Sequence, residues 1–400
     1  MSYHAKLSPS AAHRWIRCPA SVKLSEGVPD NPTIDARKGV LAHSLAELKA
    51  RKRFFPMSAR TYNSQRKKLQ ASEHYVREME GYTDRYVEVL DEHAMGFPSE
   101  PFTTLEAQVP VGQYTGERKP DGTPSTGQAD CIQIGGDTLW VTDYKNGSGV
   151  PVPAEENPQM MLYALGALSL YAPIYGDSIR QVKLTIVQPA LKSVSDWETT
   201  RADLELWGEN VIRAAARQAL SEAPPPPSAG SWCRFCPVRA RCRANADYSA
   251  ALAFQPQTEP SLLTDGELGE RLTLCRRLKS YVAVLEDYAK GALLTGKEIP
   301  GWKLVAGKSS RAWAGGEDAA FAALKAAGID EALLYERVPQ TPPKLEKALG
   351  SAVYKETVAP LVEKKPGAPS LAEESDVREA WNPPEQAFQK AEEEDAPQSS

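Results

Sequence analysis

Two aspartates and a lysine stand close together in two short apolar segments of this 400-residue chain. Asp130 lies in the first segment and Asp143 and Lys145 end the second, with Gly135-Gly136-Asp137 between the two. A glycine-rich break between two such runs is typical of a hairpin, which would bring Asp130 near Asp143. Residues two apart on a strand share a face, so Asp143 and Lys145 should lie side by side, with Tyr144 on the other face.

Two carboxylates and an ammonium at one strand end suit a hard divalent cation and a water molecule held beside it. The same residues also fit an ordinary surface hairpin with an Asp–Lys ion pair, because Asp-x-Lys is a common sequence. The choice between these interpretations depends on the rest of the chain.

Patterns along the chain predict the elements that would hold this hairpin. Further strands are expected at 103–111 and 179–188, and helices at 7–24 (broken near Cys18-Pro19), 36–53, 70–93, 154–170 and 201–221. The loop 112–126 is expected to be a mobile flap or a hairpin turn beside the strands. The order strand, strand, strand, helix, strand, helix predicts an α/β core with a mixed sheet flanked by helices.

Several polar residues on these elements are candidates for the same site. Gly39 is expected to precede the helix 36–53, with His43 in its first or second turn, where it can face a cleft. Gln159 and Tyr163 are four residues apart and should share a helix face. Glu106 either stays on the solvent face of its strand or reaches the same cation. Taken singly, each also fits a structural role, His43 and Tyr163 as packed side chains and Gln159 as an exposed one.

The composition is that of a soluble globular protein, with 42% hydrophobic and 25% charged residues, and the length allows two or three domains. No apolar run reaches the about 18 residues of a membrane-spanning helix, and the N-terminus carries no apolar signal segment. We therefore expect a cytoplasmic, reducing location. Six cysteines in that setting are more often metal ligands or buried thiols than disulfides.

Charge is unevenly distributed along the chain. Residues 37–68 hold ten Lys or Arg against one acid, Glu47, and are interleaved with aromatic residues. Residues 371–400 hold nine acidic residues and two basic ones, which accounts for the net charge of −5. The basic block can neutralise phosphates, although a solvated helix face would have the same composition.

Three closely spaced cysteines follow the tetraproline 224–227. They form the pattern Cys-x2-Cys-x5-Cys and are Cys233, Cys236 and Cys242. Such spacing indicates a metal site, and zinc and iron–sulfur sites usually have four ligands. Cys18, at a predicted helix end, is the candidate for the fourth, whereas Cys131 and Cys275 are expected to be buried thiols.

The predicted organisation has three parts. Residues 1–250 form the domain with the hairpin and the cysteine cluster. Residues 258–363 form a small α+β module, with a helix at 264–294 capped by Thr264 and Glu267, a strand near 301–313 and helices near 316–327 and 341–349. Residues 364–400 are expected to be a disordered acidic tail.

Taken in order, these residues resemble the RecB-like branch of the PD-(D/E)XK nucleases, including CRISPR-associated and helicase-linked members with a four-iron cluster. The resemblance covers roughly residues 8–245. It rests on Cys18-Pro19, Gly39-x-x-x-His43, Asp130, Asp143-Tyr-Lys145, Gln159-x-x-x-Tyr163 and the three-cysteine cluster. The whole chain also resembles an uncharacterised domain family of phages and prophages.

The resemblance implies a role for each matching residue. Asp130, Asp143 and the Tyr144 carbonyl would bind Mg²⁺ or Mn²⁺, and His43 would complete the metal's ligand set or approach the scissile phosphate. Lys145 would position and activate the attacking water and offset charge on the transition state. Gln159 and Tyr163 would contact the DNA backbone or brace Lys145. The resemblance therefore implies a catalytic group of six residues, Asp130, Asp143, Lys145, His43, Gln159 and Tyr163. Glu106 matches no certain position of the family.

The implied cofactor at Cys18, Cys233, Cys236 and Cys242 is a [4Fe–4S] cluster, which would clamp the two ends of the nuclease domain together. The expected activity is metal-dependent hydrolysis of DNA, as an exonuclease acting on single strands or duplex ends in a bacterial host cell. Phage replication or recombination proteins, or a separate helicase, are the expected partners, because the chain has no ATP-binding Gly-x4-Gly-Lys-Ser/Thr loop.

Two alternatives belong to other classes. A catalytically idle nuclease fold would serve as a DNA-binding or scaffold subunit of a phage replication or recombination complex. A zinc-stabilised nucleic-acid-binding protein would use the cysteines without any hydrolysis. Metal-dependent cleavage that Asp143→Ala abolishes separates the first from a nuclease, and metal analysis separates the second.

Overall fold

The computed structural model describes residues 5–28, 33–147, 149–250, 264–305, 316–331, 334–335 and 340–362. Contacts divide the chain into two compact units, Met1–Lys303 and Leu304–Ser400. No helix among the described residues is long and apolar enough to cross a membrane. The predicted acidic tail, 364–400, lies outside the described residues.

A five-stranded sheet forms the centre of the first unit, in the order β1-β2-β3-β4-β5. The strands are β1 (Phe102–Val109), β2 (Gly127–Gly135), β3 (Thr138–Tyr144), β4 (Gln181–Gln188) and β5 (Ser193–Thr200). Only β3 and β4 pair in parallel, and the other neighbours are antiparallel. The prediction of an α/β core with a mixed sheet is confirmed, and β5 is an additional strand that the sequence analysis missed.

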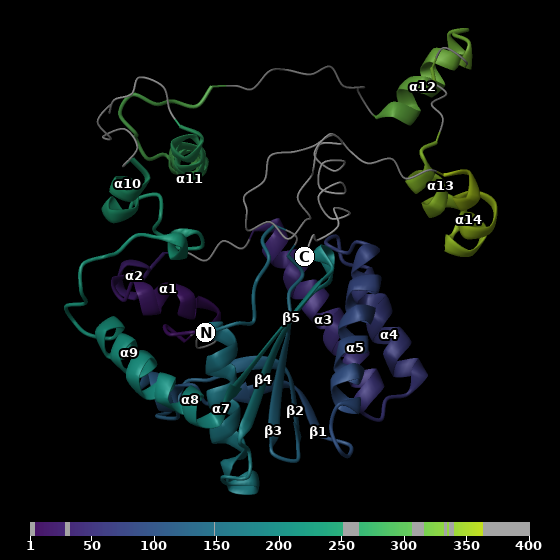
Figure 1. Cartoon of the computed structure of the whole chain (residues 1–400). Helices are drawn as coiled ribbons and strands as arrows, with labels where there is room; N and C mark the ends of the chain where they lie inside the picture. Colours follow the sequence, from purple (N-terminus) through teal and green to yellow (C-terminus); the bar gives the residue numbers. More distant parts are fainter. Residues whose placement is uncertain are drawn as a thin grey trace, which may run out of the picture. The chain divides into compact units, whose positions relative to one another are not determined.

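Helices cover both faces of the sheet (Figure 1). One layer consists of α1 (Ala12–Arg17), α2 (Ala20–Leu24), α7 (Pro158–Tyr175), α8 (Arg201–Trp207) and α9 (Arg213–Ala219), with the π-helical turn Gly208–Ile212 between the last two. The other layer consists of α3 (Ile34–Phe54), α4 (Ala59–Gln70) and α5 (Glu78–Met95). Each layer has its own buried apolar cluster against the sheet, one centred on α7 and one on α3 and α5.

Helix α7 connects the parallel strands β3 and β4, and such a connection must cross over the sheet. Its N-terminus is fixed by Asn157, whose side chain accepts hydrogen bonds from the Gln159 and Met160 amides. It packs closely on β1, since a Cβ on Gly166 would lie 2.8 Å from the Val109 Cβ. The crossover therefore starts α7 near the end of β3, where Asp143 and Lys145 stand.

Helix α3 starts earlier than the sequence analysis expected. Thr33 caps it by accepting a hydrogen bond from the Ala36 amide, so Gly39 lies inside the helix and does not precede it. His43 is therefore in its third turn, not in the first or second. Likewise, the predicted helix 70–93 begins only at Glu78, because the chain turns at Ser72–Tyr75, where the Tyr75 amide bonds to the Ser72 carbonyl.

Further turns and helices complete the first unit. They are the 3₁₀ turns Pro9–Ala11 (η1), Pro189–Leu191 (η2) and Ser231–Cys233 (η4), and the helices α6 (Gly112–Thr115), α10 (Arg243–Ala250) and α11 (Asp265–Leu294). Helix α11 has the predicted capping box of Thr264 and Glu267. Its Cys275 is exposed, so the expectation of a buried thiol is wrong. Among the described residues, α11 packs mainly on α10 and buries only Ala292 fully.

The described part of the second unit is helical. It contains α12 (Glu317–Ala326), α13 (Pro342–Leu349), α14 (Ser351–Thr357) and the 3₁₀ turn Ala359–Leu361. The helices predicted near 316–327 and 341–349 are confirmed. Most of the strand predicted near 301–313 lies outside the described residues, and the described part, 301–305, holds only an isolated bridge between Ile299 and Trp302.

Glu80 of α5 joins the three helices of the α3–α5 layer. Its carboxylate lies 2.8 Å from the buried Lys49 ammonium of α3, and it accepts hydrogen bonds from Arg66 and Gln70 of α4 at 3.0 and 2.8 Å. Burial opposes its ionisation, but the hydrogen bonds from Arg66, Lys49 and Gln70 lower the pKa of Glu80 to about 2. The ionised carboxylate therefore contributes to the stability of the layer.

We expect Glu80→Gln to lower the free energy of unfolding by about 2–3 kcal/mol at pH 7, after allowance for solvent screening. The folded pKa is depressed from 4.5 to about 2. The stabilisation by ionised Glu80 is therefore complete above pH 4.5 and is lost as the pH falls towards 2. Urea unfolding across this range measures it. Glu88→Gln, at a 62% exposed glutamate of the same helix, is the control and should cost under about 0.5 kcal/mol. Equal losses in the two variants would contradict this account.

Candidate active site

The two aspartates lie together at one end of the β2–β3 hairpin. Gly135 pairs with Thr138 and Cys131 pairs with Thr142, so Asp130 and Asp143 are the next residues of the same ladder. The Asp130 Oδ2 also accepts a hydrogen bond of 2.8 Å from the Tyr144 amide. The predicted hairpin and the approach of the two carboxylates are confirmed.

Asp143 and Lys145 form the ion pair that the strand spacing predicts. The Lys145 Nζ lies 2.9 Å from the Asp143 Oδ2, and the Asp143 side chain is only 2% exposed. The contact joins the ammonium to a buried carboxylate oxygen as a charge-assisted pair. Burial raises the pKa of Asp143, although Lys145 opposes this. Burial alone would lower the pKa of Lys145, but the Asp143 charge raises it.

Gln159, in the first turn of α7, joins the pair to Tyr163. Its Oε1 accepts a hydrogen bond of 3.1 Å from the Lys145 ammonium. Its Nε2 lies 3.3 Å from the Asp143 Oδ1 and donates to the Tyr163 hydroxyl at 3.0 Å. The Gln-x-x-x-Tyr motif thus holds both charged groups, and Gln159 is not merely an exposed neighbour of a core tyrosine.

His43 reaches the site from the opposite helix layer. Its Nδ1 lies 3.3 Å from the Asp130 Oδ2, and the side chain is 34% exposed. Its ring meets the Tyr144 ring edge-on, with centroids 5.3 Å apart. Although burial lowers it, the hydrogen bond and charge of Asp130 raise the pKa of His43 on balance.

Glu106 is a third carboxylate at the same place. Its neighbours in β1 pair with Ala129 and Cys131, which puts Glu106 across the ladder from Asp130. The Glu106 backbone has φ 54°, an uncommon value for a residue other than glycine and one that interrupts the strand. Burial and the Asp130 charge raise the pKa of Glu106 to about 7. Glu106 was expected either to stay on the solvent face of its strand or to reach the same cation as the aspartates, and its position close to the aspartates favours the second expectation.

Negative charge therefore exceeds positive charge in this pocket. The pKa values of Asp143, Glu106, His43 and Lys145 are all raised. Each shift favours binding of a proton, so the pocket attracts cations. Within the described ranges, no three His, Cys, Asp or Glu side chains converge in a metal-holding group. His43 and Lys145 contact the carboxylates instead.

The four predicted cysteine ligands line one cavity, although they come from both ends of the domain. Cys18 lies directly after α1, and the other three follow the proline-rich segment. The Ser228 hydroxyl bonds the Arg17 carbonyl at 2.7 Å and so ties this segment to α1. All four thiols are free, and burial raises the pKa of Cys233 and Cys236.

The space between these cysteines is about 10 Å³, close to what one water molecule needs. As they stand, no three of these thiols converge closely enough to hold a metal ion, so a bound centre of either kind would require the side chains to rearrange. Cys131, by contrast, is buried in β2 as expected, and burial raises the pKa of its thiol.

The fold and the site define an α/β protein with a buried, carboxylate-rich polar centre at the end of its hairpin strands. The chain belongs to the family described as "Protein of unknown function (DUF2800)", whose model matches residues 4–379. Among solved structures, the chain titled "Crystal structure of SSO0001" is similar at 16% sequence identity. The match covers 56% of this chain and 93% of that one, with a TM-score of 0.22. A TM-score this low carries no argument about fold.

Proposed function

We propose that this protein is a metal-dependent deoxyribonuclease with a PD-(D/E)XK core of the RecB-like type. The observation that carries the proposal is the buried Asp143–Lys145 pair, held by Gln159 and placed beside Asp130. Burying a carboxylate and an ammonium together costs stability unless every remaining bond is satisfied. Keeping this pair buried therefore costs stability, which supports a functional role over a purely structural one.

The residues present fit a divalent cation of the Mg²⁺ or Mn²⁺ type. Asp130 and Asp143 would hold it through carboxylate oxygens, with the Tyr144 carbonyl and His43 as further ligands. A bound divalent ion would lower the pKa of a water molecule and neutralise charge on a phosphodiester. Glu106 faces the same place and adds to the negative charge that a cation would offset.

The chain's own groups have roles that follow from their contacts. Lys145 keeps its proton because of Asp143, so it can donate a hydrogen bond to a phosphate oxygen or orient the attacking water. Gln159 fixes the Lys145 ammonium and the Asp143 carboxylate in one arrangement. The Tyr163 hydroxyl orients Gln159 in turn. His43 shares the Asp130 oxygen with the Tyr144 amide and can exchange a proton with solvent.

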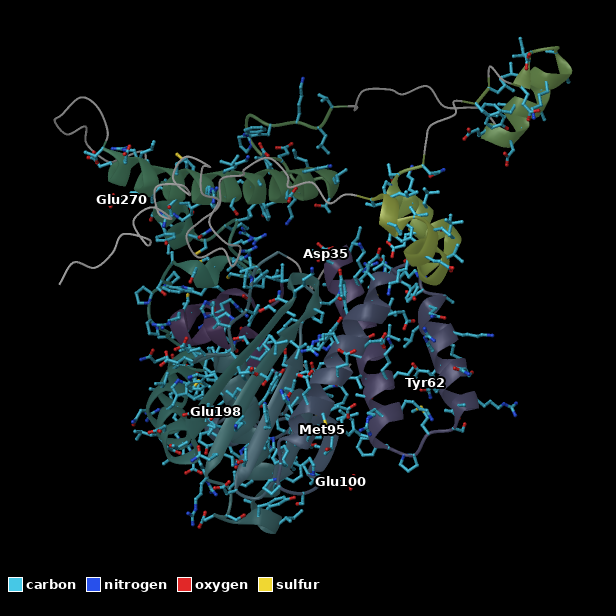
Figure 2. The ribbon with its side chains drawn as sticks, turned by 45° about the vertical axis from the view of Figure 1, so that its right-hand side comes forward. Asp35, Tyr62, Met95, Glu100, Glu198 and Glu270 are labelled. Carbon is cyan, nitrogen blue, oxygen red and sulfur yellow. The ribbon has the colours of Figure 1, made fainter. Side chains whose placement is uncertain are left out.

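The basic block of the sequence supports a polyanionic substrate. Four of its ten cations are engaged by acids, namely Lys49, Arg51, Arg53 and Arg66. In α4, however, Arg60, Lys67 and Lys68 are exposed, and no ion pair within the described residues involves them. Helix α4, which carries Tyr62, packs on α3 and lies away from the sheet (Figures 1 and 2). It offers a positive surface on the His43 side that can attract DNA.

For the cysteines we propose a metal centre that clamps α1 to the end of the domain, as a [4Fe–4S] cluster. The four thiols around one cavity support a shared centre, and a zinc ion is the competing occupant because of the small space. A bound centre would stabilise the fold, since ligands from distant parts of the chain come together only in the folded state.

The activity test compares wild type with Lys145→Ala on end-labelled linear and circular DNA in Mn²⁺. We expect wild type to cut, and Lys145→Ala to lose at least about 100-fold in rate, because the water or phosphate loses its charged partner. Lys183→Ala is the matched control, since Lys183 is also a strand lysine paired with an acid, Glu198, at 2.6 Å. Gln159→Ala is a second variant in case the first does not fold.

Cleavage of linear DNA alone would identify an exonuclease, and cutting of circles an endonuclease. A wild-type protein that binds DNA but cuts neither form would favour the idle scaffold. Equal rates for wild type, Lys145→Ala and Gln159→Ala would overturn the assigned site.

The cysteine test measures iron, sulfide and zinc in anaerobically purified protein. We expect Cys18→Ser and Cys236→Ser to lose the metal and to unfold at lower temperature, because each removes one of four ligands. Cys275→Ser is the control, since this exposed thiol lies outside the cavity. Stoichiometric zinc without iron would exclude the cluster, and full metal retention in Cys18→Ser would exclude Cys18 as a ligand.

A further inference from the structure

A second cavity of about 430 Å³ lies beside the carboxylate site, between the N-terminal turn η1 and the start of β2. Its size is in the range of pockets that hold small ligands. Its polar walls are formed by Ser8, Ser10, Gln108, Lys119, Gln128 and Tyr163. None of these except Tyr163 belongs to the motifs that define the proposed active site.

The charge of this cavity is opposite to that of the neighbouring site. Among the described residues that line it, Lys119 is the one that carries a charge, whereas Glu47, Glu106 and Asp130 line the pocket next to His43. Gln128 of the cavity lining donates a hydrogen bond to the Glu106 carboxylate of that other pocket. The nearest acid on the Lys119 turn is Asp121, whose carboxylate is hydrogen-bonded to Thr123. The cavity therefore favours an anion, at a short distance from a site that favours a cation.

Lys119 is presented by a rigid turn. The predicted flap or hairpin turn at 112–126 contains a bridge between Arg118 and Pro124, and the Lys119 amide donates to the Thr123 carbonyl at 2.8 Å. Of the mobile flap and the hairpin turn expected for this loop, the structure shows the hairpin turn. Its backbone hydrogen bonds hold Lys119 at the cavity, and the Asp121 carboxylate of the same turn interacts with the Lys119 charge.

The remaining walls offer uncharged hydrogen-bonding groups. The Gln108 Oε1 accepts a bond of 2.9 Å from Thr126, and no bond from its amide nitrogen is found within the described residues. The Ser8 and Ser10 hydroxyls lie 3.3 Å apart, and one of them donates a hydrogen bond to the other. Gly127 allows Pro9 and Tyr163 to approach β2 closely, because a Cβ there would lie 2.7 Å from Pro9 and 2.9 Å from Tyr163.

Two residues connect the lining of this cavity to the proposed active site. Tyr163 lines it and bonds to Gln159, which contacts Asp143. Gln128 lines it from β2 and precedes Asp130 by two residues, so both side chains start from the same strand face about 6–7 Å apart. That spacing corresponds to one or two nucleotides of a strand, which rises about 3.4 Å per nucleotide when stacked.

We propose that this cavity binds the nucleotide adjacent to the scissile phosphate of a DNA strand. Lys119 contacts its phosphate, and Gln108 and Ser10 donate hydrogen bonds to its phosphate or sugar oxygens. The inference rests on the proposed nuclease function, because that function is what makes a DNA strand the ligand. It adds a subsite that fixes where the strand lies relative to Asp143 and Lys145.

The test is equilibrium binding of a fluorescent 12-nucleotide single-stranded DNA in EDTA, where no cleavage occurs. We expect Lys119→Ala to weaken binding about 3- to 10-fold at 50 mM salt and to reduce the salt slope by about 0.7, the value for one phosphate contact. Gln108→Ala should weaken binding without changing the slope. Lys119→Arg should keep the slope, and Lys290→Ala, at an exposed lysine of α11, is the control.

The outcomes separate this subsite from the nuclease function. The proposed subsite is wrong if Lys119→Ala binds the oligonucleotide with the wild-type affinity and salt slope, or if it loses no more affinity than Lys290→Ala does. This holds even when wild type cuts DNA. If Lys119→Ala loses affinity and slope while wild type cuts no DNA with Mn²⁺, the subsite stands and the nuclease function fails. Absence of any DNA binding by wild type would overturn the subsite.

Discussion

The site depends on one constraint: Asp143 is buried at the end of a strand, and among the described residues the cation in contact with it is Lys145. A buried carboxylate is expensive without a full set of partners, so the surrounding structure has to supply them. The parallel pairing of β3 with β4 helps, because it demands a crossover that begins beside Asp143. The crossover helix α7 brings Gln159 into contact with both charges, and Tyr163 secures Gln159 from the next turn.

The opposite helix layer supplies the second half of the site. His43 projects from α3 to Asp130, and α3 is itself held to α4 and α5 through the carboxylate of Glu80. The two helix layers, which cover opposite faces of the sheet, thus both contribute to the site at the β2–β3 end. An excess of negative charge results, with an anion-attracting cavity at Lys119 on one side and exposed cations of α4 on the other. A negative site between two positive surfaces suits a polyanion whose phosphates bind to the positive surfaces while a metal cation at the negative site binds one of them.

Much of this site could be predicted from the sequence because its main signals are local. The glycine turn before Thr138 predicts the hairpin, strand periodicity places Lys145 beside Asp143, and helical spacing pairs Gln159 with Tyr163. Signals that depend on tertiary structure were missed. Strand β5 alternates half-buried and exposed residues and lacks an apolar face. Gly39 led us to expect too late a start for α3. Cys275 is exposed because α11 buries few of its residues among those described. The turned backbone of Glu106 and the cavity at Lys119 have no sequence signature, since each arises where separate segments meet.

The most direct measurement is calorimetric titration of Mn²⁺ into wild type and Asp130→Asn, in two buffers of different ionisation enthalpy. The account predicts saturable binding by wild type with net release of protons, because the cation replaces protons that the crowded carboxylates and His43 hold. Asp130→Asn should bind at least about 10-fold more weakly and release fewer protons. Asp121→Asn, at an exposed turn carboxylate, should match wild type. Absence of saturable Mn²⁺ binding by wild type, or equal affinity in Asp130→Asn, would contradict a cation site at the end of the hairpin.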